Sequence, residues 1–208
     1  MFLDTLVVGP LQENSYVVAC EETKEAIIID PGAEAERIYR VVTFHGFTLK
    51  YVMNTHGHVD HVGGVAYIVE KTSVPFLMHE EDMYLIEGFE HDPIRAFLMD
   101  ARTPPAPDRF LHEGENITVG NIEFQVLHTP GHTPGGVCFL TGKTLFSGDT
   151  LFSNSIGRTD LPGGNYEQLL TSIREKLLSL DDDVKVYSGH GNVTTIGSER
   201  QFNPFFRI

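Results

Sequence analysis

Residues 55–64 bring together side chains that commonly bind metal ions. The stretch reads THGHVDHVGG and places His56, His58, Asp60 and His61 within six positions. Three imidazoles and a carboxylate this close would need solvation if buried, and a bound cation removes that conflict. Because side chains at i and i+2 of an extended segment point the same way, His56 and His58 can bind one ion from one side. Asp60 and His61, past a bend, can then face a second position. The stretch predicts a site for two adjacent metal ions; the alternative is a polar loop whose histidines are solvated or hydrogen-bonded.

Catalytic metal ions usually take ligands from several segments of a chain. Three further candidates follow strand-like runs, each next to a glycine: His132 in TPGHTPG, Asp149 in SGDT and His190 in SGHG. Any one of them alone would more simply be a loop residue with a local hydrogen bond. Together they supply the distant partners that residues 55–64 require.

Strand and helix patterns alternate around these ligands. The segment 49–54 has the pattern of a strand and would deliver residues 55–64 at its carboxyl end, where open α/β sheets usually place their sites. The proline-rich segment 104–107 predicts a surface connection between two halves. Strands and helices in both halves predict an α+β or α/β fold, a four-layer αββα sandwich of two mixed β-sheets flanked by helices. Strands are expected at 3–8, 15–20, 25–30, 49–54, 75–79, 116–119, 122–127, 136–140, 144–147 and 184–187, and helices at 33–44, 65–71, 80–89, 93–99 and 166–178.

The composition is that of a folded protein rather than a disordered chain. Its 208 residues, 41% of them hydrophobic and 21% charged, suit a single domain, 1–208. The net charge of −14 argues against a nucleic-acid partner, because binding phosphates needs clustered Lys and Arg. With no membrane-length apolar run and no basic leader, we expect no membrane partner and a cytoplasmic location. Cys20 and Cys138 are expected to be buried free thiols, and the oligomeric state is left open.

The order of these ligands, HxHxDH at 56–61 followed by His132, Asp149 and His190, resembles the metallo-β-lactamase-fold hydrolases over nearly the whole chain. Further motifs are similar to those of the short glyoxalase II-like (hydroxyacylglutathione hydrolase-like) enzymes. They are DPG at 30–32, TPGHTPG at 129–135, SGDTLF at 147–152, SIGRTDLPGG at 155–164, TTIGSER at 194–200 and NPF at 203–205.

The resemblance implies a role for each ligand. One metal would be held by His56, His58 and His132, a second by Asp60, His61 and His190, and Asp149 would bridge the two. Asp60 and Asp149 would hold a bridging water. Asp30 would orient the ligand loop from outside the metal shell. These nitrogen and oxygen ligands suit two divalent ions, zinc first, with iron or manganese as alternatives.

This sequence differs from several other branches of the metallo-β-lactamase-fold proteins, and these differences make the functions of those branches less expected here. Asp149 stands where one major lactamase class has a metal-binding Cys, and His58 where oxygen-reducing diiron proteins have Glu. The nuclease branch carries a large inserted domain and would prefer a basic surface. Only 18 residues (208 minus 190) follow His190, so we expect the glutathione-binding C-terminal helical domain of full-length glyoxalase II to be absent. Arg158 is then the nearest candidate to receive a substrate carboxylate, unless it pairs within its own loop.

Three functions are consistent with this reasoning. The first is hydrolysis of a small-molecule thioester, S-acylglutathione or a related compound, by a metal-bridging hydroxide at a dinuclear site. A thiolate leaving group needs little help from an acid, because thiol pKa values lie at about 8.5. The second is the reaction of persulfide dioxygenases, which look alike here and hold one iron through the equivalents of His56, His132 and Asp149. The third is a non-catalytic metal-binding domain. The five other histidines are expected to be surface or structural residues: His45, His79, His91, His112 and His128.

Overall fold

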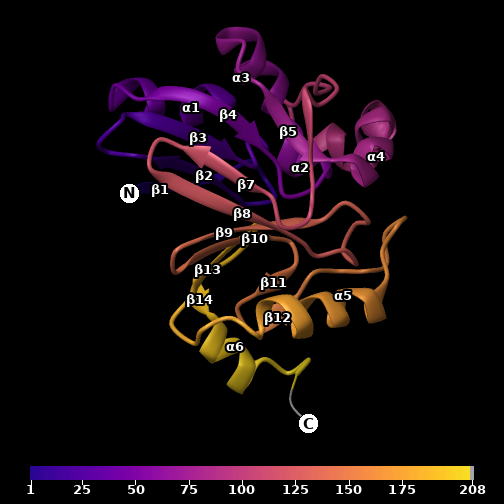
Figure 1. The fold of residues 1–208 in the computed structure, drawn as a ribbon. Coiled ribbons are helices and arrows are strands. Elements are labelled where there is room, and N and C mark those ends of the chain that lie inside the picture. The colour runs from indigo at the N-terminus through magenta and orange to yellow at the C-terminus, as the bar shows by residue number, and fades with distance from the viewer. Residues whose placement is uncertain (207–208) are drawn as a thin grey trace.

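Two six-stranded β-sheets lie face to face between two layers of helices (Figure 1). The computed structural model describes residues 1–206. Helices α1 (Ala35–Phe44) and α3 (Val65–Thr72) cover the first sheet, while α5 (Tyr166–Ser172) and α6 (Ile196–Phe202) lie on the side of the second. The predicted four-layer αββα fold class is therefore confirmed.

The first sheet is mixed because its connections differ. Its strands, in spatial order, are β1 (Phe2–Val8), β2 (Glu13–Ala19), β3 (Glu25–Ile29), β4 (Thr48–Met53), β5 (Phe76–His79) and β6 (Arg109–Leu111). β1, β2 and β3 pair antiparallel, whereas β3 to β6 pair parallel and need helical crossovers. The β4–β5 crossover holds α3 and the short α2 (Val59–Val62), and the β5–β6 crossover holds α4 (Met83–Gly88).

The second sheet has one parallel pair. Its strands, in spatial order, are β14 (Thr194–Thr195), β13 (Lys185–Ser188), β10 (Thr144–Gly148), β9 (Val137–Thr141), β8 (Ile122–His128) and β7 (Asn116–Val119). β10 and β13 run parallel, and the chain between them passes through a small hairpin of β11 (Leu151–Phe152) and β12 (Ser155–Ile156) and then α5. The other neighbours are antiparallel.

Alternation along the strands builds the cores between the layers. In β3, Ile27 and Ile29 point into the core between the sheets, where Phe124 and Phe146 of the second sheet meet them. Ile28 points the other way, into the core beneath α1 and α3. All three isoleucines are fully buried, which explains why β3 is apolar on both faces.

Local structure departs from the predicted elements in a few places. The predicted helix at 93–99 is a 3₁₀-helix, Pro93–Phe97. None of its residues is fully buried and Ile94 is its contact with the core, which is too little apolar burial to support a longer helix. The predicted helix at 166–178 is α-helical only to Ser172 and continues as a π-helical turn, Ile173–Leu177. β6, β11, β12 and β14 were not predicted, because strands of two or three residues show no periodicity.

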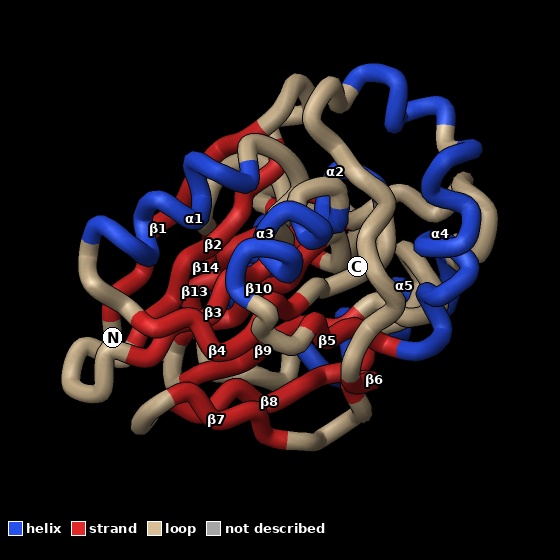
Figure 2. Tube along the Cα trace, turned by 90° about the horizontal axis from the view of Figure 1, so that it is seen from above, coloured by secondary structure: helices blue, strands red, loops and turns tan. Residues whose placement is uncertain are grey.

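The strand ends that carry the predicted ligands lie on the side of the molecule away from the N-terminus. Seen from above, α2 and α4 lie at this end, while α1 and α3 lie over the strands (Figure 2). Over residues 1–206, no helix is long and apolar enough to cross a membrane.

Candidate metal centre

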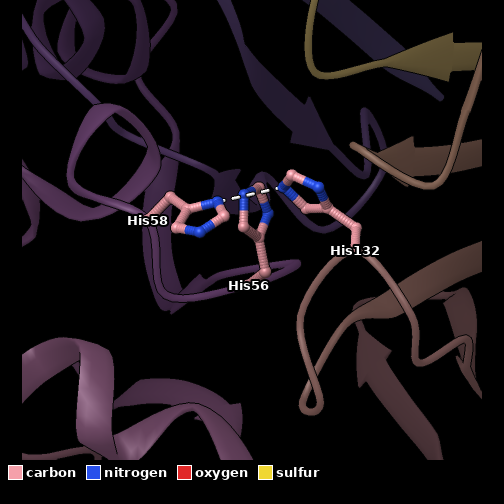
Figure 3. Close-up of side chains that lie close together, drawn as sticks. All are labelled: His56, His58 and His132. Carbon is pink, nitrogen blue, oxygen red and sulfur yellow. Dashed lines mark hydrogen bonds between the residues drawn. The ribbon is translucent and has the colours of Figure 1, made fainter. Parts of the chain in front are cut away.

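The loops after β4, β8, β10 and β13 bring all seven predicted ligands together. Two groups form, each with ligand atoms within 4.8 Å of one another: a three-histidine group of His56, His58 and His132, and a mixed group of Asp60, His61 and His190. In Figure 3 the three rings of the first group turn their nitrogen atoms toward one another from two different segments of the chain.

Hydrogen bonds fix which ring nitrogens are free in the three-histidine group. Nδ1 of His132 donates to the carbonyl oxygen of Arg158 at 2.8 Å, which leaves its Nε2 as the lone-pair atom, 3.0 Å from Nδ1 of His58. Nδ1 of His56 donates to the hydroxyl of Thr55 at 3.0 Å. Nε2 of His56 is buried and has no hydrogen-bond partner within residues 1–206. The free ring nitrogens of these histidines therefore face a common position where a cation could bind.

Asp30 contacts the ligand loop through its buried carboxylate. Its carboxylate accepts hydrogen bonds from the backbone N–H of Thr55 at 2.7 Å and from the Thr55 hydroxyl at 2.6 Å. It also lies 3.1 Å from Nδ1 of His61, and the Asn54 amide that donates to Asp30 at 3.2 Å also donates to the His61 carbonyl oxygen at 2.7 Å. One buried carboxylate therefore orients a residue of each ligand group, His56 through Thr55 and His61 directly.

Asp149 lies between the two groups. Its Oδ1 is 3.4 Å from Nε2 of His61, and its Oδ2 is 3.6 Å from Nε2 of His132 and 3.7 Å from Nε2 of His190. The approach depends on Gly189, where a Cβ atom would lie 2.2 Å from Oδ1 of Asp149. Asp149 thus has a carboxylate oxygen within 3.7 Å of a histidine nitrogen from each group.

Histidine pKa values shift in opposite directions in the two groups. Burial, followed by the nearby histidines, lowers the pKa of His56 well below its usual value, and burial and His132 lower the pKa of His58 to about 3. His56 and His58 are thus neutral at physiological pH, the form in which imidazole binds metal.

In the mixed group the carboxylates of Asp60 and Asp149 favour the protonated form of the neighbouring histidines. Burial opposes charge on His61, but Asp149 and Asp60 outweigh it and raise the pKa of His61. The pKa of His190 is likewise raised, since Asp60 and Asp149 offset burial. The pKa of Asp149 is lowered, because His61 and its neighbours outweigh burial. Buried carboxylates that hold protons on imidazoles mark a position where a divalent cation fits.

Polar residues of β2 support the mixed group, and the sequence prediction missed them. The Asn14 amide donates to the carbonyl oxygens of Ser188 at 2.9 Å and Gly191 at 3.0 Å, on either side of His190, and the Tyr16 hydroxyl donates to Ser188 at 2.6 Å. The signal available was a polar run, QENSY at 12–16, that leads into a strand pattern. Glu13 of the same run is buried 3.9 Å from His61.

A cleft of about 640 Å³ opens over the centre and is lined by His58, Asp60, His132, Asp149 and His190. Its apolar wall comes from α4, the 3₁₀-helix Pro93–Phe97, β11 and the loops beside them: Leu11, Leu85, Ile94, Phe152, Leu161 and Pro162.

Arg158 also lines this cleft, but its guanidinium makes two hydrogen bonds to Asp160, at 2.7 and 2.8 Å. The structure therefore places Arg158 in an ion pair within its own loop, the alternative to contact with a substrate carboxylate. The pair is exposed, so exchange for another carboxylate costs little.

A further cluster lies outside the seven ligands. His79, Glu81 and His128 have ligand atoms within 4.8 Å of one another, a proximity that the sequence did not predict. The two rings stack at 4.1 Å with 12° between their planes, and Nε2 of His128 contacts the Pro134 carbonyl oxygen at 2.8 Å. Lone pairs in parallel ring planes do not converge on one ion, so this is a structural contact.

Comparison with known proteins agrees with this architecture. The profile of the metallo-beta-lactamase superfamily matches residues 8–190. Hydroxyacylglutathione hydrolase GloC of Haemophilus influenzae is 42% identical, with 99% of this chain and 98% of GloC aligned. The chain belongs to the metallo-β-lactamase superfamily, a superfamily of metallo-hydrolases.

Solved structures show the same fold over nearly the full chain. The BLEG-1 B3 metallo-beta-lactamase is 39% identical with a TM-score of 0.88, covering 99% of both chains. TTHA1623 in a di-iron-bound form is 42% identical with a TM-score of 0.87, covering 97% of this chain and 99% of its own.

Proposed function

We propose that this protein hydrolyses small-molecule thioesters at a dinuclear metal site. The observation that carries the proposal is the position of Asp149, which faces both ligand groups at the floor of one open cleft. The resemblance to GloC, a protein named hydroxyacylglutathione hydrolase, supports a thioester as the substrate class.

The chain's own residues prepare this site for hydrolysis. The three-histidine group would hold one divalent ion, the mixed group a second, and Asp149 would contact both. Bound ions would lower the pKa of water and stabilise negative charge on a carbonyl oxygen. Asp60 and Asp149 would accept hydrogen bonds from the attacking water and so orient it. Since a thiolate leaves without a strong acid, the histidines need only hold their lone pairs in place.

The donor set fits several metals. It offers imidazole nitrogens and carboxylate oxygens, which suit zinc, iron and manganese. Zinc is the first choice, and the di-iron form of TTHA1623 supports iron as well.

The cleft suits a substrate with an apolar portion beside its reacting carbonyl. Its walls place leucine, isoleucine, phenylalanine and proline side chains around the metal ligands. An open cleft in direct contact with the ligands also favours an enzyme over a non-catalytic metal-binding domain, which would need no such access.

The test is a thioester panel with metal analysis. Protein loaded with zinc, iron or manganese should cleave at least one of S-lactoylglutathione, S-acetylglutathione and S-acetyl-N-acetylcysteamine, with two metal ions per chain. A β-lactam in the same assay reports on the alternative suggested by BLEG-1. Failure with every thioester at full metal occupancy would refute the proposal.

A persulfide dioxygenase is the second candidate. The observation that favours it is that Oδ2 of Asp149 lies 3.6 Å from Nε2 of His132, which itself groups with His56. Two histidines and one carboxylate are the type of ligand set that binds a single iron in oxygen chemistry. Oxygen uptake with glutathione persulfide at one iron per chain would select this candidate. Two ions per chain without oxygen uptake would exclude it.

A further inference from the structure

Asp82 is a buried carboxylate that belongs to neither ligand group. It ends the 3₁₀-turn Glu80–Asp82 that follows β5, and its side chain is fully buried. Its Oδ2 accepts from the backbone N–H of Gly57 at 2.9 Å and from the Thr133 hydroxyl at 2.8 Å. Its Oδ1 accepts from the backbone N–H of Gly135 at 2.7 Å.

These donors lie in the two loops that carry the three-histidine group. Gly57 stands between His56 and His58 in the loop after β4 of the first sheet. Thr133 follows His132 in the loop between β8 and β9 of the second sheet. One carboxylate therefore ties together the histidine loops of both sheets.

Glycines make this close approach possible. A Cβ atom at Gly135 would lie 2.7 Å from the Asp82 nitrogen and 2.8 Å from its carboxyl carbon and Oδ1. A Cβ atom at Gly57 would lie 3.1 Å from the Asp82 carbonyl oxygen and 3.2 Å from its Cβ. Each loop thus has a glycine where it packs on Asp82, and any side chain would push the loops apart.

We propose that Asp82 is a positioning residue that sets the spacing of His56 and His58 relative to His132, and thereby the metal affinity of the three-histidine group alone. The mixed group takes its support from other residues, because Asp30 contacts His61 and Asn14 brackets His190. The inference deepens the proposed function, since it concerns the same metal centre, but its test does not require turnover.

Substitution of Asp82 by Asn tests this role. An amide has one acceptor oxygen, and its NH₂ group would face a donor, so the two loops could no longer share three hydrogen bonds. To read each metal position separately, Asp82→Asn is placed in a His190→Ala background, which weakens the mixed group, and in a His58→Ala background, which weakens the three-histidine group. Cobalt titration, followed by visible absorption, measures affinity in both.

We expect Asp82→Asn to weaken cobalt binding by roughly 10-fold or more in the His190→Ala background, as loss of an outer-shell contact does. In the His58→Ala background the change should stay within about 2-fold. Asp108→Asn is the matched control, because its carboxylate accepts from the N–H of Phe76 at 2.9 Å at the opposite end of β5. It should leave both affinities unchanged.

Equal weakening in both backgrounds, or no weakening in either, would overturn the inference. If Asp82→Asn does not fold, Thr133→Val decides in the same way, because it removes one of the three donors and preserves the side-chain shape. A loss confined to the three-histidine group supports the role of Asp82, and any other pattern rejects it. Thioester assays on the unmodified protein separately decide the proposed function.

Discussion

Nε2 of His61 lies 3.4 Å from Oδ1 of Asp149, and both atoms are buried without a hydrogen bond inside residues 1–206. An unpaired buried acceptor costs free energy unless a proton or a cation satisfies it. The carboxylates raise the pKa of His61, so a proton takes that role when no metal is bound. Metal binding at the mixed group must displace this proton.

The first prediction is a difference in pH dependence between the two metal positions. A ligand with a raised pKa stays protonated to higher pH, so affinity at the mixed group should fall as pH drops from about 8 to about 6. His58, with its pKa lowered to about 3, is deprotonated over that whole range, so the three-histidine group should change little. Calorimetry in buffers of different ionisation enthalpy should detect proton release in a His58→Ala variant and almost none in a His190→Ala variant. Equal release from both would contradict the prediction.

The second prediction concerns Asp30, which contacts both groups. Asp30→Asn should weaken both metal positions by roughly 10- to 100-fold, because Thr55 and His61 lose a shared acceptor. It should also destabilise the metal-free protein by about 1 to 3 kcal/mol, the cost of a disrupted buried hydrogen-bond network. Denaturant unfolding with EDTA measures stability, and cobalt titration measures affinity. Asp100→Asn, at an exposed carboxylate that accepts from the Glu34 N–H, is the control. An effect on only one metal position would argue against a shared support.

The metal ligands could be found from sequence because four of them form one tight motif at 56–61 and the other three stand next to glycines at the ends of strand patterns. The residues that support the ligand loops could not be found in this way. Asp82 stands in the acidic run EED at 80–82, which is indistinguishable from a solvated surface run until the fold brings Gly57 and Gly135 against it. Asn14 bonds to residues 174 and 177 positions away, a separation at which no local pattern carries information.

The main elements followed from periodicity, and the errors fall in very short strands and where the type of helix changes. β3 was predictable because a continuous apolar run is typical of a strand buried on both faces, and its three isoleucines are indeed buried. The π-helical turn at Ile173–Leu177 was not, since the apolar spacing of this segment fits an ordinary helix. Arg158 shows a similar limit at the site: its type and position left open both a substrate contact and a pair within its own loop, and the structure shows the pair with Asp160.

The third prediction concerns the support of His190. Asn14→Asp replaces an amide donor with a carboxylate that faces the carbonyl oxygens of Ser188 and Gly191. Because those oxygens would then repel it, the loop should shift and metal affinity at the mixed group should fall by roughly 10-fold. The three-histidine group should be unaffected, the opposite of the pattern expected for Asp82→Asn. Cobalt titration in the two single-group backgrounds provides the measurement, with Asn116→Asp, at an exposed position, as the control. Weakening of the three-histidine group by Asn14→Asp would contradict the separate supports.

The last prediction tests whether Arg158 can leave Asp160 for a substrate. An exposed ion pair contributes only about 0 to 1 kcal/mol, so a substrate carboxylate can compete for the guanidinium. Arg158→Gln should therefore raise KM by roughly 5-fold for a glutathione thioester, which carries carboxylates, and leave KM for an N-acetylcysteamine thioester unchanged. Asp160→Asn should do the reverse, lowering KM for the glutathione thioester by releasing the guanidinium. kcat should stay within about 2-fold in both variants, because the side chain of Arg158 contacts no metal ligand and only its backbone oxygen holds His132. If both thioesters respond equally to Arg158→Gln, the arginine serves its own loop and not the substrate.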